Sequence, residues 1–544
     1  MKIVIAGGVA AGTKVAAKLK REQRDAEVLI LTKGADISYA GCGLPYYVGD
    51  VIKHREDLVI NTPESFSALT GAEVRTGVEV TGVDRAAKTV TAKDLATGQT
   101  QTYPYDKLVI STGASPFIPD CPGTDLENVF VMRTPDDADA LKQKVDSGEI
   151  KRVVIAGAGF IGLEVAENLS ARGVKTTVID FAPHILPELL DSEMSEYLES
   201  VMADAGVMPF TNVALEGITG EGKVEKVLTS RRPMKADAVV LGLGFRPNTA
   251  FLSDSGLEMF KGTLLVNEHM QTNDPDIYAA GDCALVTNRI TGQRQWSAMG
   301  STANITGRLA AMYMAGDSQA AAYPGVLGTG VAKLPGINMG RTGLTEKAAR
   351  AAGYDVETVI TVGEDKAGYY PGASNFYTKM ICDRQTHRLL GIQVAGKGAV
   401  DKMVDIAVTA ISLGAKLEDL QSCDFAYTPP FSTAIHPFSV TVNVLLNKLS
   451  GTFETMTPAQ YAQGEAEGYR IVDCGTKPQI PGAMYLNQTS VQGPVDGLGQ
   501  DEKLLLICTR GRQAYLLQNR LKFYGYTNTR VLEGGTQFNL SVLE

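Results

Sequence analysis

The segment from residue 153 to residue 180 constrains the fold of this chain more than any other. An apolar run, Val153-Val154-Ile155-Ala156, leads into Gly157-Ala158-Gly159-Phe160-Ile161-Gly162 and then into helix-forming residues. A second apolar run, Thr176-Thr177-Val178-Ile179, ends at Asp180. Glycines between a strand and a helix let backbone N–H groups approach a pyrophosphate, and an acid after the second strand can accept a ribose hydroxyl. The segment therefore predicts a dinucleotide-binding domain with a parallel sheet, and Asp180 favours NADH over NADPH.

A weaker copy of this pattern opens the chain. The strand Ile3-Val4-Ile5-Ala6 runs into Gly7-Gly8-Val9-Ala10-Ala11-Gly12, but Val9 replaces the middle glycine and Thr32 stands where the acid is expected. Two later segments, Ser111-Thr112-Gly113-Ala114 and Ile277 to Asp282, each follow or contain a short strand and complete the pattern of a flavin site. We expect FAD to be bound by Gly7, Gly8, Val9, Ala10, Gly12, Thr32, Lys33, Thr112, Gly113, Ala114, Gly281 and Asp282. We expect NAD(P)H to be bound by Gly157, Gly159, Phe160, Ile161, Gly162, Asp180 and Gly244.

A lone cysteine follows the first of these units. Cys42 lies in Ser38-Tyr39-Ala40-Gly41-Cys42-Gly43-Leu44-Pro45-Tyr46, with no second cysteine within a turn or two. The glycines predict a turn before a helix, and a helix N-terminus favours thiolate over thiol. A single activated thiol must find its second sulfur, or its oxygen, on the substrate.

Composition excludes several classes of protein. The formal net charge of -10 argues against general nucleic-acid binding. No apolar run is long enough to span a bilayer, and Met1-Lys2 leads straight into a strand, so we expect a cytoplasmic protein without a signal peptide. The seven cysteines are spread widely, which predicts neither a metal site nor a disulfide framework.

Residues 1 to about 447 resemble the flavoprotein disulfide reductases, most closely the coenzyme A-disulfide reductases and NADH-dependent persulfide reductases. The resemblance rests on both glycine loops, on Ser38 to Tyr46, on Tyr369-Tyr370-Pro371-Gly372-Ala373, and on Ala426 to Ser432. It implies FAD and NADH as cofactors, coenzyme A as substrate or ligand, and a homodimer. In such relatives a tyrosine from each of the last two segments reaches the cysteine of the other subunit, so Tyr427 first, then Tyr369 or Tyr370, are the expected partners of Cys42.

Two related branches fit less well. The NADH oxidases and peroxidases that the chain resembles carry a histidine in the first glycine loop, where this chain has Ala10. The glutathione reductase-type enzymes pair a C-terminal histidine with a glutamate five residues on, but the fifth residue after His436 is Thr441. His436 is therefore either a weak acid or a surface or interface residue.

A basic stripe is the expected footprint of coenzyme A. Lys14, Lys18 and Arg21 recur at i, i+4 and i+7 and therefore share one helix face, which suits either phosphates or plain solvation. Ser38 and Gly41 flank the thiol. Relatives usually carry Asn at position 41, and the loss of that side chain either widens the site or weakens its hold on the substrate.

The tail after Gly451 changes pattern. Thr457-Pro458 predicts a helix start, and short strand-like runs then alternate with helices. This segment resembles a rhodanese domain, with Cys508-Thr509-Arg510-Gly511-Arg512-Gln513 as a cysteine loop that could stabilise a persulfide. Arg512 comes one residue early for the usual loop, so the domain either transfers sulfur through Cys508 or only docks substrate. Cys474 is predicted to be structural.

These observations predict an α/β protein with two Rossmann-like domains, an α+β dimerisation domain and a degenerate rhodanese-like α/β domain. The expected boundaries are 1–113 with 245–325 for FAD, 114–244 for NAD(P)H, 326–447 for dimerisation and 455–544 for the last domain. The predicted activity is NAD(P)H-driven reduction of coenzyme A persulfide, polysulfide or coenzyme A disulfide through Cys42. The alternatives are an NADH oxidase or peroxidase, and a redox or persulfide sensor with little turnover.

Overall fold

The computed structural model describes residues 1–317 and 320–543. They form two compact units, one of residues 1–183 with 206–326, the other of residues 184–205 with those from 327 onward. Within the described ranges, no helix is both long and apolar enough to cross a membrane.

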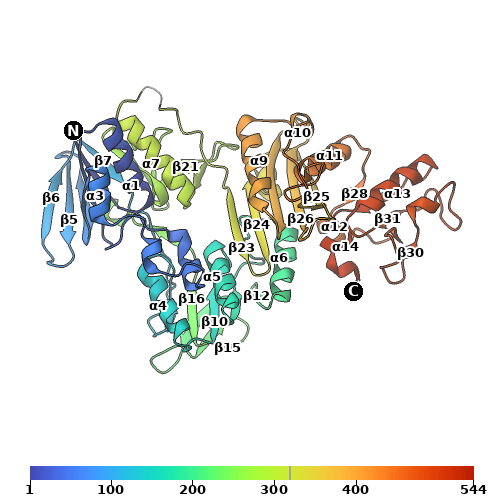
Figure 1. The fold of residues 1–544 in the computed structure, drawn as a ribbon, viewed down its shortest axis with the longest axis horizontal. Coiled ribbons are helices and arrows are strands. Elements are labelled where there is room, and N and C mark those ends of the chain that lie inside the picture. Colours follow the sequence, from blue (N-terminus) through green and yellow to red (C-terminus); the bar gives the residue numbers. More distant parts are fainter. Residues whose placement is uncertain (318–319, 544) are drawn as a thin grey trace. The chain divides into compact units, whose positions relative to one another are not determined.

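The first glycine loop belongs to a five-stranded parallel sheet in the first unit. Its strand order is β20-β7-β1-β2-β3, and Ile3 of β1 lies beside Val28 of β2. Residues 3–6 are all buried, as expected for a parallel strand covered on both faces. Helix α1 (Ala10–Glu22) packs along α7 (Gly300–Met314), as Figure 1 shows. The strands are β1 (Lys2–Ala6), β2 (Glu27–Leu31), β3 (Glu73–Arg75), β7 (Lys107–Ile110) and β20 (Ile277–Ala279).

A second parallel sheet in the same unit repeats this plan. Its order is β12-β11-β10-β16-β9, and α5 (Phe160–Ala171) connects β10 to β11. Helix α2 (Leu44–Val48), which follows Cys42, packs against α5 and against α4 (Pro135–Asp146). The strands are β9 (Val129–Phe130), β10 (Arg152–Ala156), β11 (Lys175–Ile179), β12 (Met208–Phe210) and β16 (Ala238–Leu241).

Shorter strands and helices complete the first unit. Strands β4-β5-β6 and β13-β14-β15 form three-stranded sheets, β8 pairs with β17, and β18-β19-β21-β22 form a four-stranded sheet. Their bounds are β4 (Val78–Asp84), β5 (Thr89–Asp94), β6 (Thr100–Pro104), β8 (Ala114–Pro116), β13 (Leu215–Thr219), β14 (Lys226–Thr229), β15 (Met234–Lys235), β17 (Phe245–Pro247), β18 (Met259–Phe260), β19 (Thr263–Leu265), β21 (Ala284–Thr287) and β22 (Arg294–Trp296), with helix α3 (Pro63–Thr70).

The second unit contains an antiparallel sheet of order β23-β24-β27-β26-β25. Helix α9 (Val400–Leu413) packs on β24 and β27, α11 (Pro437–Leu449) packs on β25, and α6 (Ser192–Asp204) also contacts the sheet. Strand β25 is an edge strand. The strands are β23 (Gly330–Leu334), β24 (Ile337–Gly343), β25 (Val356–Glu364), β26 (Asn375–Asp383) and β27 (Leu389–Gly396), with the short helices α8 (Glu346–Ala351) and α10 (Leu417–Gln421).

The tail forms a five-stranded parallel sheet of its own, in the order β28-β32-β31-β29-β30. Figure 1 shows the tail, with β28, β30, β31 and α13 labelled, at the C-terminal end of the chain. Thr457 caps α12 by accepting the N–H of Gln460, as the sequence predicts. Helix α13 packs on β31 and β32. The elements are β28 (Thr455–Met456), α12 (Pro458–Ala462), β29 (Arg470–Asp473), β30 (Met484–Tyr485), β31 (Leu504–Ile507), α13 (Arg512–Phe523), β32 (Thr529–Leu532) and α14 (Gly535–Phe538).

The predicted two Rossmann-like sheets and the separate α+β region are confirmed. The predicted domain boundaries stay a prediction. The compact units place residues 184–205 with the second unit, whereas the sequence analysis includes them in the NAD(P)H domain.

Candidate functional site

Three segments converge at the carboxyl ends of β1, β7 and β20. The Ser111 N–H donates to the Ala6 carbonyl (2.8 Å), and the Ala280 N–H donates to the Ile110 carbonyl (3.0 Å). Gly7 has φ +110°, and a Cβ on Gly12 would lie 1.9 Å from the Gly7 carbonyl oxygen. The loop therefore requires glycine at both positions, as a phosphate-binding turn does. The predicted residues of the first loop and of the 112–114 and 281–282 segments are thus brought together.

The remaining predicted residues of this site have varied surroundings. Thr32 is buried, and its backbone bonds to Arg75 and Val78, so it offers no acid for a ribose. Lys33 is exposed and pairs with Glu79 at 2.9 Å.

The other predicted FAD residues pack within the loop or hydrogen-bond nearby segments. Gly8 packs beside Thr32 in the core, Val9 lies at the N-cap position of α1, and Ala10 packs against a small cluster of buried alanines. Thr112 and Asn248 exchange hydrogen bonds, Ala114 lies in β8, and the Gly281 N–H donates to Thr306.

Asp282 is the acid that the sequence assigns to a ribityl hydroxyl. Its side chain is mostly buried and pairs with Arg133 at 3.1 Å, while its carbonyl accepts the indole N–H of Trp296 at 2.7 Å. The carboxylate is thus held at the same sheet edge as the glycine loop and keeps lone pairs for a further donor. The tight loop and this acid fit FAD.

The second glycine loop is better formed for a nucleotide. A Cβ on Gly157 would lie 2.2 Å from the Gly242 carbonyl oxygen, and one on Gly162 would lie 2.0 Å from the Gly157 carbonyl oxygen. Gly159, the N-cap of α5, instead faces open space, which leaves room for a pyrophosphate at the helix N-terminus. Phe160 and Ile161 form the first turn of α5, and Gly244 (φ +99°) also faces open space.

Asp180 lies beside this loop. Its carboxylate accepts the N–H of Ala158 (2.7 Å) and of Ala182 (2.8 Å). Two backbone bonds leave part of the carboxylate's four-acceptor capacity for ribose hydroxyls. The acid and the open glycine fit NAD(P)H.

Cys42 lies in a short 3-10 turn, residues 41–43, that runs directly into α2. Its thiol is free and exposed. Arg133, Asp282 and Glu164 are close enough to affect its titration, and they come from the α4, β20 and α5 regions respectively. Cys42 therefore lies between the residues of the two nucleotide loops.

The predicted lowering of the Cys42 pKa is wrong for the polypeptide itself. Although the side chain is exposed, the surrounding protein desolvates it and raises the pKa; Glu164 and Asp282 act in the same direction, and Arg133 opposes them. Helix α2 has only five residues, and burial together with the two acids outweighs any dipole that this helix supplies.

Glu164 is a residue that the sequence analysis did not single out. It lies on α5, just after the second glycine loop, and accepts the phenol O–H of Tyr46 at 3.2 Å. Burial raises the pKa of Glu164 to about 7, against the lowering effect of the Tyr46 hydrogen bond. A carboxyl group that titrates near neutrality beside a thiol can exchange protons with it. The signal in the sequence was its position two residues after Gly162, on the helix that α2 contacts.

The predicted tyrosines lie in the second unit, and two of them meet. The hydroxyl of Tyr427 hydrogen-bonds Tyr369 and raises the pKa of the Tyr369 phenol. Tyr369 is 78% exposed, and Tyr370 and Tyr427 are also exposed. Two segments more than fifty residues apart thus present their phenols at one place on the surface.

His436 is neither a surface residue nor a free acid. It is buried, its Nδ1 accepts the N–H of Phe438 at 3.2 Å, and it therefore caps α11. Burial, together with Lys402, lowers its pKa to about 4. The histidine is structural, which corrects the expectation of a surface position.

The basic stripe is only partly available for phosphates. Lys18 is buried and forms an ion pair with Glu22, whereas Lys14 is half-buried and Arg21 is exposed. Ser38 adopts φ +49° and is fixed by hydrogen bonds with Gly8 and Ile60. Gly41 is exposed, and a Cβ there would meet only the Tyr39 ring at 3.9 Å, so the position has room for a side chain.

Cys508 lies in a backbone cradle at the end of β31. Its sulfur accepts the N–H of Gly511 (3.1 Å) and of Ala514 (3.4 Å). A hydrogen bond from Cys474 and the backbone N–H groups lower the Cys508 pKa to about 6, although burial opposes them. Only 2% of Cys508 is exposed. The cradle that the sequence suggests is present, with a thiolate at neutral pH.

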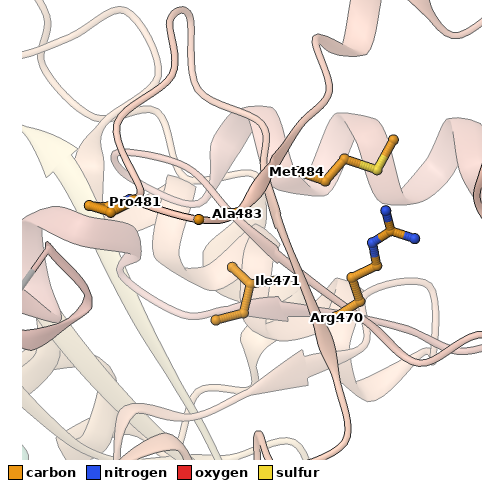
Figure 2. Close-up of a pocket in the computed structure, with 6 residues that line it drawn as sticks. Arg470, Ile471, Pro481, Ala483 and Met484 are labelled. Carbon is orange, nitrogen blue, oxygen red and sulfur yellow. The ribbon is translucent and has the colours of Figure 1, made fainter.

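A surface pocket of about 440 Å³ lies elsewhere in the same domain. Figure 2 shows its lining, Arg470 and Ile471 from the start of β29 and residues 481–484 before and within β30. Cys508 follows the opposite end of the neighbouring strand and does not line it. The pocket therefore does not bear on the thiol chemistry.

Comparisons with known proteins agree with this geometry. Residues 1–304 match the family described as pyridine nucleotide-disulphide oxidoreductase, and residues 333–437 match its dimerisation domain. An NADH oxidase of Methanocaldococcus jannaschii is 34% identical over 83% of this chain and 100% of its own length. An NAD(P)H coenzyme A polysulfide/persulfide reductase of Pyrococcus horikoshii is 34% identical over 82% of this chain and 98% of its own.

A solved structure extends the similarity through the tail. The reduced CoADR-RHD of Bacillus anthracis covers 100% of this chain and 98% of its own, with a TM-score of 0.93 and 30% identity. FAD and NAD(P)H are the cofactors of the matched family, and both fit the two loops described above. The chain belongs to the pyridine nucleotide-disulphide oxidoreductase family.

Proposed function

We propose that this protein uses NADH to reduce coenzyme A persulfide, polysulfide and coenzyme A disulfide through Cys42. The observation that carries the proposal is an accessible single thiol between the residues of two nucleotide loops. In the reaction, the Cys42 thiolate attacks the inner sulfur of a coenzyme A persulfide and expels hydrosulfide. The resulting Cys42–coenzyme A disulfide takes up two electrons and a proton, which restores the Cys42 thiolate and frees coenzyme A. Bound FAD supplies the two-electron relay from NADH.

The carboxyl group of Glu164 supports this reaction by holding a proton near the thiol. Its pKa of about 7 lets it donate and accept at neutral pH, and Tyr46 fixes its position. The Cys42 pKa is raised in the polypeptide, and Arg133 is a neighbouring group that opposes this and favours the thiolate.

We further propose a homodimer in which tyrosines of one subunit act at Cys42 of the other. The matched dimerisation domain supports the dimer. Tyr369 and Tyr427 lie exposed and hydrogen-bonded to each other, with exposed Phe431 and Ile435 in the same segment as Tyr427. Solvent-exposed aromatic and aliphatic side chains of this kind are typical of a surface that a partner covers. Tyr427, Tyr369 and Tyr370 would then donate a phenol hydrogen bond to a leaving thiolate.

The tail is proposed to be a rhodanese-like domain that carries sulfane sulfur on Cys508. The backbone cradle and the low Cys508 pKa support a bound persulfide anion, and the full-length match to CoADR-RHD supports the domain type. Lys14 and Arg21 remain as candidate phosphate contacts for coenzyme A.

Anaerobic NADH turnover tests the proposal. The substrates are coenzyme A persulfide, coenzyme A disulfide and hydrogen peroxide. The variants are Cys42→Ser, Cys508→Ser and Cys423→Ser. Cys423 is a second exposed free thiol, so Cys423→Ser is the matched control for Cys42→Ser. Fast sulfide release that Cys42→Ser abolishes and Cys423→Ser retains supports the reductase. Preference for peroxide, or turnover that survives Cys42→Ser, contradicts it and favours the oxidase branch that the Methanocaldococcus relative represents. Unchanged persulfide turnover in Cys508→Ser would remove the tail from the reaction.

A further inference from the structure

The second cysteine of the tail, Cys474, lies beside Cys508. Each follows the end of a strand, Cys474 after β29 and Cys508 after β31, and the two strands are parallel neighbours with Asp473 opposite Ile507. The Cys474 N–H donates to the Ile507 carbonyl at 2.8 Å. Neighbouring strands lie about 4.8 Å apart, within the Cα separation of about 4.4–6.8 Å that a disulfide requires. The backbone therefore already has the spacing for a bridge.

The thiols themselves are in contact. The Cys474 thiol donates to the Ile507 carbonyl at 3.1 Å, and the Cys508 sulfur is near enough to act as a second acceptor for the same proton. The Cys508 sulfur and burial raise the Cys474 pKa, so the pair holds its one proton on Cys474 and its negative charge on Cys508. Both residues belong to the buried core of the tail, where neither competes with solvent for its partner.

The segment that carries Cys474 is rigid. Asp473 is buried, and its carboxylate accepts the N–H groups of Gly475 and Ile480, both at 3.0 Å. The carboxylate thus ties the turn after β29 to the strand end. The bond from the Cys474 N–H to the Ile507 carbonyl holds the same segment beside β31.

We propose that Cys474 resolves a persulfide formed on Cys508. This inference rests on the proposed role of Cys508 as a sulfane-sulfur carrier. The Cys474 sulfur attacks the Cys508 Sγ and forms a Cys474–Cys508 disulfide, while the bond from Cys508 to the terminal sulfur breaks. That sulfur leaves with the bonding electron pair and takes up the Cys474 proton, so the terminal sulfur of the persulfide anion departs as hydrosulfide. One sulfur–sulfur bond replaces another, and no external electron is needed.

The step gives the tail its own route to sulfide. It yields one sulfide per chain without NADH and without Cys42, and it then stops at the disulfide. A low-molecular-weight thiol, such as coenzyme A, would reopen the bridge in two successive exchanges, with formation of its own disulfide. That product is a substrate of the proposed reductase.

The test uses the full chain with Cys42→Ser, kept anaerobic and free of NADH. The protein is first reduced, then treated with one equivalent of inorganic tetrasulfide, and sulfide release, intact mass and a peptide map are measured. We expect a mass loss of two hydrogens and a linked pair of peptides containing Cys474 and Cys508. We also expect each chain to release one more sulfide than a chain that carries Cys508→Ser as well. Adding Cys474→Ser should instead leave a mass gain of one sulfur and lower the excess sulfide by about tenfold or more. Cys382→Ser, another buried thiol, is the matched control and should behave as the parent does.

Two results would overturn the inference. A persulfide on Cys508 that persists equally long with and without Cys474 would show that Cys474 does not attack, while the sulfur-carrier role survives. Failure of Cys508 to take up sulfur in any variant would remove the carrier role and this inference together. The disulfide-linked peptide is measured in the chain that retains Cys474. Its presence or absence therefore tests the attack by Cys474 even if Cys474→Ser does not fold.

Discussion

Glu533 links the tail to the antiparallel sheet of the second unit. Only 2% of the residue is exposed. One carboxylate oxygen accepts hydrogen bonds from Lys448 and Thr455, both at 2.7 Å, and the other accepts the Ile360 N–H at 2.8 Å. Ile360 lies in the edge strand β25, so this outward N–H has no strand partner. The Glu533 carboxylate thus accepts a free N–H at the sheet edge and also pairs with the buried ammonium of Lys448.

Replacing Glu533 with alanine should therefore destabilise the junction. Breaking a buried ion pair costs about 3–5 kcal/mol, because one charge stays buried without its partner. Lys448 would still keep Glu357 at 3.1 Å and the Thr358 carbonyl at 2.8 Å, which places the cost near the lower limit. We expect the free energy of local opening to fall by about 3 kcal/mol, a value that includes the loss of the Ile360 hydrogen bond.

Hydrogen exchange at Ile360 and along β25 measures this opening directly. A chain of several domains does not unfold in one transition, so a global melting temperature would not isolate the junction. A loss of about 3 kcal/mol corresponds to about a hundredfold faster exchange wherever this opening controls exchange. Glu454→Ala is the matched control, since Glu454 pairs with Lys522 at 3.4 Å on the surface, where a pair contributes about 0–1 kcal/mol.

The reasoning would be refuted if Glu533→Ala and Glu454→Ala changed exchange of β25 equally. It would also be refuted if Glu533→Ala left β25 protected but released the tail to proteolysis, because the carboxylate would then hold the tail without stabilising the edge strand. The exchange rate of β25 in Glu533→Gln should fall between those of Glu533→Ala and Glu454→Ala. An amide oxygen can still accept the Ile360 N–H, but it carries no charge to pair with Lys448.

Three further outcomes are expected. Gly162→Ala should weaken NADH binding strongly, because its Cβ would meet the Gly157 carbonyl oxygen at 2.0 Å. Gly159→Ala, at an open position, should distort the loop less. Titration with NADH compares the affinities of the two variants. Alkylation of Cys508 in a Cys42→Ser chain should rise with pH to a plateau above pH 7, with its midpoint near the pKa of about 6, as followed by peptide mass. Lys379→Met should destabilise the second unit by about 3–5 kcal/mol, since it removes the buried cation that pairs with Asp191, Glu193 and Glu346. Denaturant unfolding of that unit measures the loss.

The nucleotide loops could be predicted from the sequence because their determinants are local. A Cβ on Gly162 is excluded by the carbonyl oxygen of Gly157, which lies in the same loop, and Gly157 itself has a φ of +108°. The same holds for the cap at Thr457. In each case the residues that decide the geometry are neighbours along the chain.

The surroundings of the thiols could not be predicted in the same way. Glu164 and Arg133 reach Cys42 from segments that lie far along the chain, so no pattern around Cys42 announces the raised pKa. The sequence predicts only a structural role for Cys474. Its pairing with Cys508 follows from strand register, which places two strand ends side by side although their sequences share nothing.

The contrast between Cys42 and Cys508 favours one direction for sulfur transfer. A thiol with a low pKa leaves readily but attacks weakly, whereas one with a higher pKa attacks strongly once it is deprotonated. Cys508, buried with a pKa of about 6, is thus suited to hold sulfur and to give it up. Cys42, exposed and with a raised pKa, is suited to attack a persulfide that arrives from elsewhere. Sulfur should therefore move from Cys508 to a coenzyme A thiol, and Cys42 should then attack the resulting coenzyme A persulfide and release that sulfur as hydrosulfide. Labelled sulfur loaded on Cys508 should appear on coenzyme A before NADH is consumed.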